Sequence, residues 1–269
     1  MVKKKELNIS NCGFDHDYAD TLVCSQWQSK SNSALYLIYR WSFETFATVI
    51  FSISFYSFSQ MKPIEFYFIF LTHWGVLINM ILGIYGALLV TYWHCDTEYR
   101  ENIQKKEIIP TAFKIYWAIH NCALELSLVI SIFYWFILYP NSNQPLSTPN
   151  VLVHGMNSAI MFLDLLVIAF PMRLYHVIQP IGFGLCYTIF SIIYYLCDGY
   201  GLDKSKKYIY PPLNWETPDK ALITVLGVLI LIIVIHTVLF WIYKLRVFIQ
   251  RRFFTTELVL AYEDRKDVE

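Results

Sequence analysis

The hydrophobic positions of this chain fall into six long apolar runs separated by polar segments. Each run has at least about 20 residues, the length of α-helix that crosses a hydrocarbon core of about 30 Å. A segment inside lipid must pair its own backbone groups, which favours helices. We therefore predict an all-α fold, a six-helix integral membrane bundle, with spans at about 34–58, 64–93, 113–138, 151–171, 177–197 and 221–243.

Ile64–Trp93 is the run with the clearest internal pattern, and it carries no charged residue after Glu65. As one helix it would be roughly 45 Å long, enough to cross a bilayer with a tilt. Its small and polar residues recur every three or four positions and therefore share one side of the helix. We expect this stripe to face other helices, and it consists of Thr72, Gly75, Asn79, Gly83 and Gly86.

Composition supports a membrane protein and changes little else. Hydrophobic residues make up 56% of the chain and charged residues 16%, whereas a soluble domain has about 25% charged residues. The 21 basic and 21 acidic residues give no reason to expect a nucleic-acid partner. Residues 1–33 are polar and lack the apolar core of a signal peptide, so the first span is expected to stay as an uncleaved anchor. The membrane domain is then 34–243, followed by a tail at 244–269.

Basic residues predict the orientation. With six spans both termini share one side of the membrane, and that side holds 14 of the Lys and Arg residues. The opposite side holds five, so we expect the termini to be cytosolic. The longest segment on the outer side, Asp198–Lys220, is rich in aromatic residues and contains paired prolines. We predict that it forms an ordered cap on the membrane surface.

Ionisable side chains within the spans need partners, because they are expensive in lipid and face the bundle interior. Arg40 and Glu44 are four residues apart on one predicted helix and can pair directly. His120, Glu125, Asp164 and His236 reach similar depths on other helices. The charges nearly compensate one another, which favours a buried network that fixes helix register. The alternative is a pathway for protons or ions.

A second polar group lies nearer the predicted outer surface. His154 and Asn157 share one helical face, at about 5 Å and 9 Å below the outer boundary. Thr72 enters its own span from the same side and lies about 12 Å deep. A hydroxyl beside an imidazole is the minimal arrangement of an activated nucleophile. The alternative is that these residues only help the helices to pack.

Histidines on several predicted helices raise the alternative of a membrane cytochrome. His73, His120, His154 and His236 each occupy a different span. Axial haem ligands must face each other at matched depth, yet His73 lies about 100° round its helix from the small-residue stripe. We therefore expect no cofactor and no metal.

Short motifs along nearly the whole chain give a resemblance. They are SQW at 25–27, YRW at 39–41, FLTHWG at 70–75, YWAIHN at 116–121, HGMNS at 154–158, AFPMRLYH at 169–176 and YIYPPLNW at 208–215. In order and spacing they resemble the rolling stone family, six-span membrane proteins whose founding member is associated with myoblast fusion in insects. The resemblance implies a role in cell fusion or membrane organisation without catalysis, in the plasma membrane. The partners it implies are membrane lipid and other membrane proteins.

A more distant likeness, to a family of enzymes, implies a catalytic activity. FLT, HGM and the YP-x-L segment at Tyr210–Leu213 are similar to those of the androgen-induced and androgen-dependent membrane proteins. These are threonine hydrolases that cleave fatty acid esters of hydroxy fatty acids, and the likeness implies Thr72 as the nucleophile. Their essential histidine corresponds to Asn157, which cannot act as a general base. In an intramembrane threonine esterase of this kind, His154 or His73 would be the base and Asn157 would orient it or donate to the oxyanion.

Overall fold

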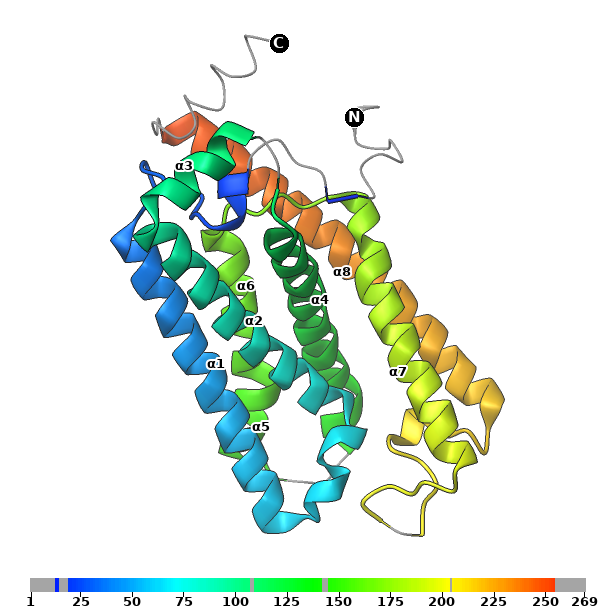
Figure 1. Ribbon diagram of the computed structural model, residues 1–269. Helices are drawn as coiled ribbons and strands as arrows, with labels where there is room; N and C mark the ends of the chain where they lie inside the picture. The colour runs from blue at the N-terminus through cyan, green and yellow to red at the C-terminus, as the bar shows by residue number, and fades with distance from the viewer. Residues whose placement is uncertain (1–12, 15–18, 107–108, 142–144, 204, 255–269) are drawn as a thin grey trace.

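Six long helical segments run through the described part of the chain and make it an all-α membrane protein (Figure 1). The computed structural model describes residues 13–14, 19–106, 109–141, 145–203 and 205–254. Within them the one β-type pairing is an isolated bridge between Ser25 and Ile168. The described helices therefore confirm the predicted fold class.

The long helices follow the predicted runs closely. α1 spans Ala34–Met61 and α2 spans Leu71–Cys95. The remaining elements are, in chain order, α4 (Thr111–Phe133) with the π-helical turn η4 (Tyr134–Leu138) and the short η5 (Tyr139–Asn141), then α5 (Thr148–Val151), the π-helical turn η6 (Leu152–Met156), α6 (Asn157–Val167), η7 (Leu174–Val177), α7 (Ile178–Leu196) and α8 (Pro218–Phe253). α8 begins before and ends well after the predicted 221–243, and residues 255–269 of the predicted tail lie outside the described part of the chain.

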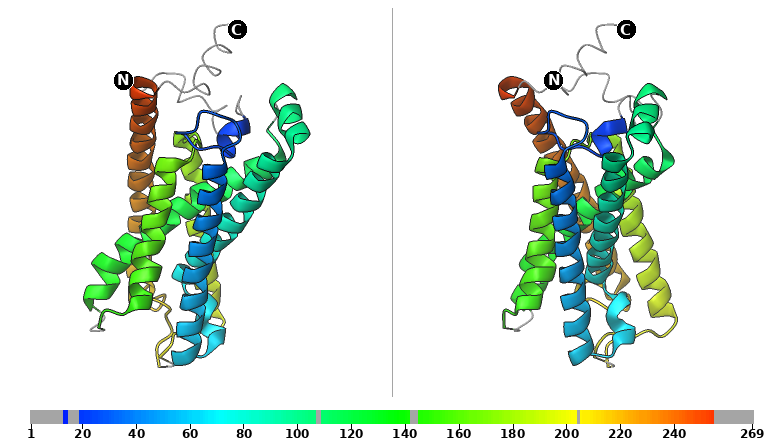
Figure 2. Two further views of the ribbon diagram at one scale, coloured as in Figure 1. Left: turned by 90° about the vertical axis from the view of Figure 1, so that its left-hand side faces the viewer. Right: turned by 60° about the vertical axis from the view of Figure 1, so that its left-hand side comes forward.

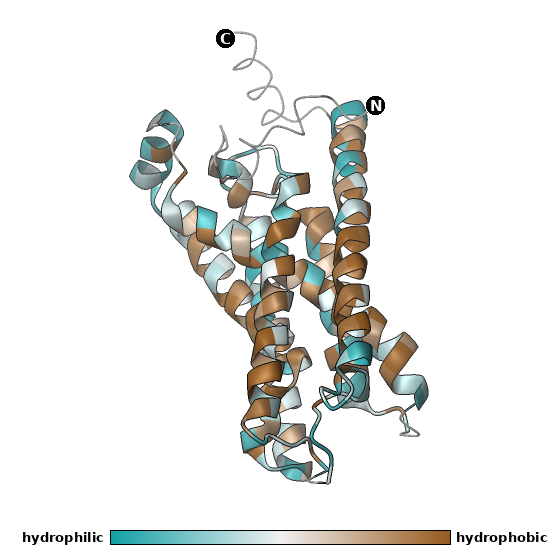
Figure 3. Cartoon of the chain, turned by 90° about the vertical axis from the view of Figure 1, so that its right-hand side faces the viewer, coloured by the Kyte–Doolittle hydropathy of each residue, from teal (hydrophilic) through white to brown (hydrophobic). Residues whose placement is uncertain are grey.

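Five of these helical segments are long and apolar enough to cross a membrane: Leu71–Cys95, Thr111–Asn141, Thr148–Val167, Leu174–Leu196 and Pro218–Phe253. α1 is long enough but less apolar, because it carries Arg40, Glu44 and several hydroxyl side chains. It packs antiparallel along α2, and Arg40 is turned into the bundle, away from lipid. Hydrophobic residues dominate the middle turns of the helices, and hydrophilic residues gather toward the two ends (Figure 3).

α4 is the central helix, in contact with α2, α6, α7 and α8. α1 lies between α2 and α6 on one side of it, whereas α7 and α8 lie together on the other side (Figures 1 and 2). One end of the bundle carries α3 (Thr97–Lys106) and is called the α3 end here. The other carries the short helix η8 (Pro211–Leu213) and is called the η8 end.

The helix predicted to start at Ile64 starts at Leu71. Ile64–Ile69 instead forms the 3-10 helix η3, and Phe70 is extended, with φ −92° and ψ 128°. Two contacts hold this turn at the η8 end: the Tyr67 hydroxyl donates to Ser54 Oγ at 2.9 Å, and the Tyr67 ring stacks on His73. The prediction of one continuous helix was wrong because apolarity does not distinguish a helix from a buried aromatic turn.

The segment before α1 is packed against the helices, which its polar composition did not predict. Leu22 and Cys24 are fully buried at the α3 end. The Ser25 hydroxyl donates to the carbonyl oxygen of Val167 at 2.8 Å, and Gln26 pairs with Gln250 of α8. This segment therefore closes the α3 end and joins the ends of α6 and α8.

The cap predicted between α7 and α8 is held by its side chains. Trp215 Nε1 donates to Ser191 Oγ of α7 at 3.1 Å, and Thr224 of α8 donates to the carbonyl oxygen of Pro212 at 2.7 Å. Tyr210 and Leu213 pack in an apolar cluster with Tyr187. Aromatic residues thus anchor the described part of this segment across the η8 end.

Candidate functional site

Arg40 of α1 forms a buried ion pair with Asp164 of α6, at 2.7 Å between Nη1 and Oδ1. The same carboxylate accepts a hydrogen bond from the Tyr39 hydroxyl at 2.7 Å and lies 3.2 Å from His120 Nε2. The pairing of Arg40 with Glu44 expected from their spacing was wrong. Glu44 is half-buried and accepts from Thr48 on its own helix, since Asp164 is the carboxylate that shares the bundle interior with Arg40.

A second buried pair joins α4 to α8. His236 Nδ1 lies 2.5 Å from a carboxylate oxygen of Glu125. The other ring nitrogen, Nε2, lies 3.0 Å from the carbonyl oxygen of Arg173, which can accept its hydrogen. With Arg40 and Asp164, this pair ties α4 to helices on both of its sides.

The small-residue stripe of α2 faces other helices, as predicted. Asn79 Nδ2 donates to Ser127 Oγ of α4 and to Asn157 Oδ1 of α6, both at 2.8 Å. At Gly86 a side chain would have no room, because an added Cβ would lie 2.2 Å from the Tyr116 hydroxyl. Asn157, one of the three candidate catalytic residues, is therefore held in a polar contact between helices.

His154, the candidate base, is stacked on Tyr134. The two ring centroids are 3.5 Å apart and the ring planes differ by 4°. Both residues lie in π-helical turns, η6 and η4, which depart from the regular helical spacing at facing positions. His154 Nδ1 is buried and has no hydrogen-bond partner among the residues that the structure describes.

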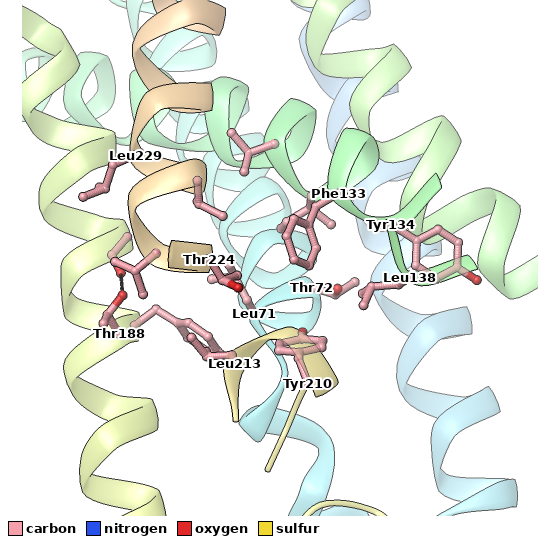
Figure 4. Close-up of a pocket in the computed structure, with 16 residues that line it drawn as sticks. Leu71, Thr72, Phe133, Tyr134, Leu138, Thr188, Tyr210, Leu213, Thr224 and Leu229 are labelled. Atoms are coloured by element: carbon pink, nitrogen blue, oxygen red, sulfur yellow. Dashed lines mark hydrogen bonds between the residues drawn. The ribbon is translucent and has the colours of Figure 1, made fainter. Parts of the chain in front are cut away.

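Thr72, the candidate nucleophile, lies in the first turn of α2 beside Tyr210. Both side chains line the same cavity, where the Tyr210 ring lies next to Thr72 (Figure 4). Burial raises the pKa of Tyr210, so this side chain is a neutral phenol at pH 7 and can both donate and accept. Among the described residues no hydrogen bond joins Thr72 to His154 or Asn157.

A cavity of about 90 Å³ lies next to Thr72, between α2, α4, α7 and α8 and above η8 (Figure 4). A smaller one of about 20 Å³ adjoins it, sharing Leu71, Val129, Gly184 and Val228. The linings of both are largely aliphatic and aromatic and include no charged residue.

The hydroxyls that line the cavity differ in their availability. Thr188 donates to the carbonyl oxygen of Gly184 at 2.9 Å, and Thr224 to that of Pro212. Tyr187 donates to the carbonyl oxygen of Ile69 at 2.8 Å. Thr72 and Tyr210 also line the cavity, and each hydroxyl can donate a hydrogen bond to a ligand or accept one from it. The described residues contain no group of three or more His, Cys, Asp or Glu side chains that could hold a metal ion.

Comparison with known proteins identifies the family. The family model described as "Protein rolling stone" matches residues 2–260. The chain belongs to the rolling stone family. It is 33% identical over 256 residues to "Protein rolling stone" of Drosophila melanogaster, which covers 93% of this chain and 91% of that protein. No solved structure matches.

In this rolling stone family member, the sequence did not predict which residues lie around Thr72. Tyr210 comes from a segment 138 positions further along the chain, and Tyr187 from α7. The YIYPPLNW motif was a usable signal for Tyr210, because a tyrosine before paired prolines, in a segment predicted to lie at the outer membrane surface, is expected to have an anchoring side chain. No sequence pattern indicates the stacking of His154 on Tyr134.

Proposed function

We propose that this protein acts in cell–cell fusion or in organising the plasma membrane, without catalysing a reaction and with both termini in the cytosol. The observation that carries the non-catalytic part is the contact of Asn157 with Asn79. In the threonine hydrolases that the chain distantly resembles, the position of Asn157 holds the essential histidine. An amide engaged in a hydrogen bond between helices has no basic nitrogen with which to take up a proton.

Family membership supports the fusion part of this proposal, since the founding member is associated with myoblast fusion. The distribution of basic residues supports the orientation, because 14 lie on the side of the termini and five on the other. Long apolar helices support residence in a membrane. No charged residue lines the cavity beside Thr72, which favours a protein that contacts lipid more than solutes.

A content-mixing assay tests the proposal. Two cell populations expressing the protein carry complementary halves of a split fluorescent reporter, and fluorescence reports fusion. We expect mixing above that of untransfected cells, unchanged in Thr72→Val and His154→Phe variants at equal surface levels. Mixing that equals the background would contradict the fusion role. Mixing abolished by Thr72→Val in well-folded protein would contradict the non-catalytic role.

A threonine esterase acting on lipid esters is the second candidate, and one observation favours it. Thr72 lies on the wall of an apolar cavity beside a neutral phenol. In this mechanism Thr72 attacks the ester carbonyl, His154 takes the hydroxyl proton and Asn157 donates to the oxyanion. His154 would first have to leave its stack on Tyr134.

A fluorophosphonate probe separates the two candidates. Labelling of purified wild-type protein that disappears in Thr72→Ala would support the esterase, whereas folded protein without label would support the non-catalytic role. Asn157→His supplies the imidazole found in the hydrolases. If this variant alone gains label that depends on Thr72, the scaffold can support the chemistry and the wild-type chain lacks the base.

A further inference from the structure

The two adjoining cavities follow α4 from the η8 end into the membrane. Their lining residues on α4 and on η4, which continues it, run from Leu138 back to Cys122, a stretch of about 24 Å at the α-helical rise per residue. One leaflet of a bilayer core is about 15 Å deep. The lining therefore extends from the level of the outer surface predicted above to beyond the middle of the core.

The wall formed by α7 and α8 is thin and faces lipid. Of the most apolar stretch of α7 only 17% is buried, and of α8 only 22%. A Cβ added at Gly184 would meet a single atom, Ile232 Cδ1, at 3.5 Å, and one added at Gly227 would meet nothing within 4 Å. Ile189 and Leu226 on these helices are exposed. A lipid molecule in the leaflet thus lies directly against this wall.

The lining restricts the chemistry of an occupant. Water is a poor occupant of the deeper part, because a buried water needs two to four polar partners and the smaller cavity is lined mainly by aliphatic side chains. An ionic ligand has no charged partner. An apolar chain fits the deep part, and the hydroxyls of Thr72 and Tyr210 at the η8 end fit an uncharged oxygen.

We propose that these cavities bind one acyl chain of a membrane lipid, with an ester or alcohol oxygen of its head group hydrogen-bonded to Thr72 and Tyr210. Part of the chain occupies the space beside Val129 and Val228, and the rest stays in the surrounding leaflet. The oxygen accepts from the Tyr210 hydroxyl, which is protonated at pH 7. This inference is independent of the fusion role, because it concerns binding alone.

Photo-crosslinking of the full chain in lipid nanodiscs tests the site. The probe is a monoacylglycerol that carries a diazirine in mid-chain and a terminal alkyne, and adducts are located by mass spectrometry after irradiation. We expect adducts on cavity residues such as Val129 and Val228, competed by excess unlabelled monoacylglycerol. Adducts confined to lipid-facing residues such as Leu226 and Ile230 would overturn the proposal.

Two glycine variants form a matched pair for this experiment. Gly184→Leu places a side chain in both cavities, whereas Gly227→Leu places the same side chain on the exposed face of α8. We expect cavity adducts to fall by about tenfold, equivalent to roughly 1.4 kcal/mol, in Gly184→Leu and to stay unchanged in Gly227→Leu. Equal labelling of both variants and wild type would contradict a cavity site. If Gly184→Leu lowers the melting temperature, Val228→Phe fills the same space and takes its place.

A double variant and a second probe test the head-group contact. Thr72→Val with Tyr210→Phe removes both hydroxyls, and labelling is compared for the monoacylglycerol probe and for an alkane probe that has the diazirine but no head group. We expect labelling by the monoacylglycerol to fall several-fold and labelling by the alkane to stay the same. If the variant leaves both probes unaffected, the head-group half of the proposal is wrong. Content mixing is also measured for Gly184→Leu. A variant that loses lipid labelling but still supports content mixing shows that lipid binding and the fusion role are separate.

Discussion

The two sides of α4 are built differently. Toward α1, α2 and α6 the helices pack closely around buried charges, and 44% of the most apolar stretch of α2 is buried. On the other side, only 17% of the most apolar stretch of α7 is buried, and cavities remain between the helices. A Cβ added at Gly86, on the first side, would lie 2.2 Å from the nearest atom of another residue. One added at Gly184, on the second side, would lie 3.5 Å from its nearest neighbour. Buried polar groups require close partners, but apolar side chains can face either protein or lipid.

Removing Asp164 should have the largest effect, on the tightly packed side. Asp164→Ala leaves Arg40 buried without its carboxylate, and breaking a buried pair in this way costs about 3–5 kcal/mol. We expect a large loss of folded protein, measured as monodisperse yield and melting temperature in detergent. Glu44→Gln is the control on the same helix, because Glu44 is half-buried and bonded to Thr48.

The double variant Arg40→Met with Asp164→Leu sharpens this result. Replacing both members of a buried ion pair by apolar residues is often neutral. We expect it to recover most of the stability lost in Asp164→Ala. A double variant as unstable as the single one would mean that His120 and Tyr39 depend on the carboxylate more than Arg40 does.

Equivalent glycine substitutions should have opposite effects on the two sides. Gly86→Ala pushes a methyl group against the Tyr116 hydroxyl and Arg40 Nη2, and overpacking of this kind costs about 1–3 kcal/mol. Gly184→Ala makes only an ordinary contact, and alanine is the better helix former by up to about 1 kcal/mol. Melting temperatures should fall for the first and stay equal or rise for the second. Equal losses in both would contradict the difference in packing.

The contact between Asn79 and Asn157 is expected to contribute less than the ion pair. Hydrogen bonds between membrane helices contribute about 0.6 kcal/mol on average and up to about 1.7 kcal/mol. Asn157→Leu removes the acceptor of one of the two bonds donated by Asn79. We expect a modest fall in melting temperature, and a double-mutant cycle with Asn79→Leu gives the coupling between the two residues. Zero coupling would mean that the contact with Asn79 does not stabilise the fold, so that Asn157 would be available for a catalytic role.

The smallest effect should come from the exposed pair of Asp198 and Lys207, 2.6 Å apart at the η8 end. The Lys207 ammonium group lowers the pKa of the Asp198 carboxyl. A lowered folded-state pKa gives stability above the unfolded pKa of about 3.9, and this is lost as the pH falls through the folded value. Lys207→Met should therefore lower the melting temperature slightly at pH 7, and this difference should vanish as the pH falls through the lowered pKa of the folded-state Asp198 carboxyl. A difference that grows on acidification would contradict this sign.

Much of the fold was predictable because each span must satisfy its own backbone and present apolar side chains to lipid. These local requirements appear in the sequence as long apolar runs, and the stripe on α2 appears as a period of three or four. The start of α2 was not predictable in this way. Ile64–Ile69 is as apolar as the helix that follows, and only its aromatic contacts hold it as a separate turn.

The sequence by itself determined the class of the protein, its family motifs and which residues inside the membrane need partners. Only the tertiary structure decided which residues those partners are: Asp164 and not Glu44 for Arg40, Asn79 for Asn157 and Tyr134 for His154. It also placed Tyr210 beside Thr72 in the wall of the cavity. The physical reason is that periodicity fixes the face on which a side chain lies but not the helix that meets this face. That choice depends on the packing of all the helices together.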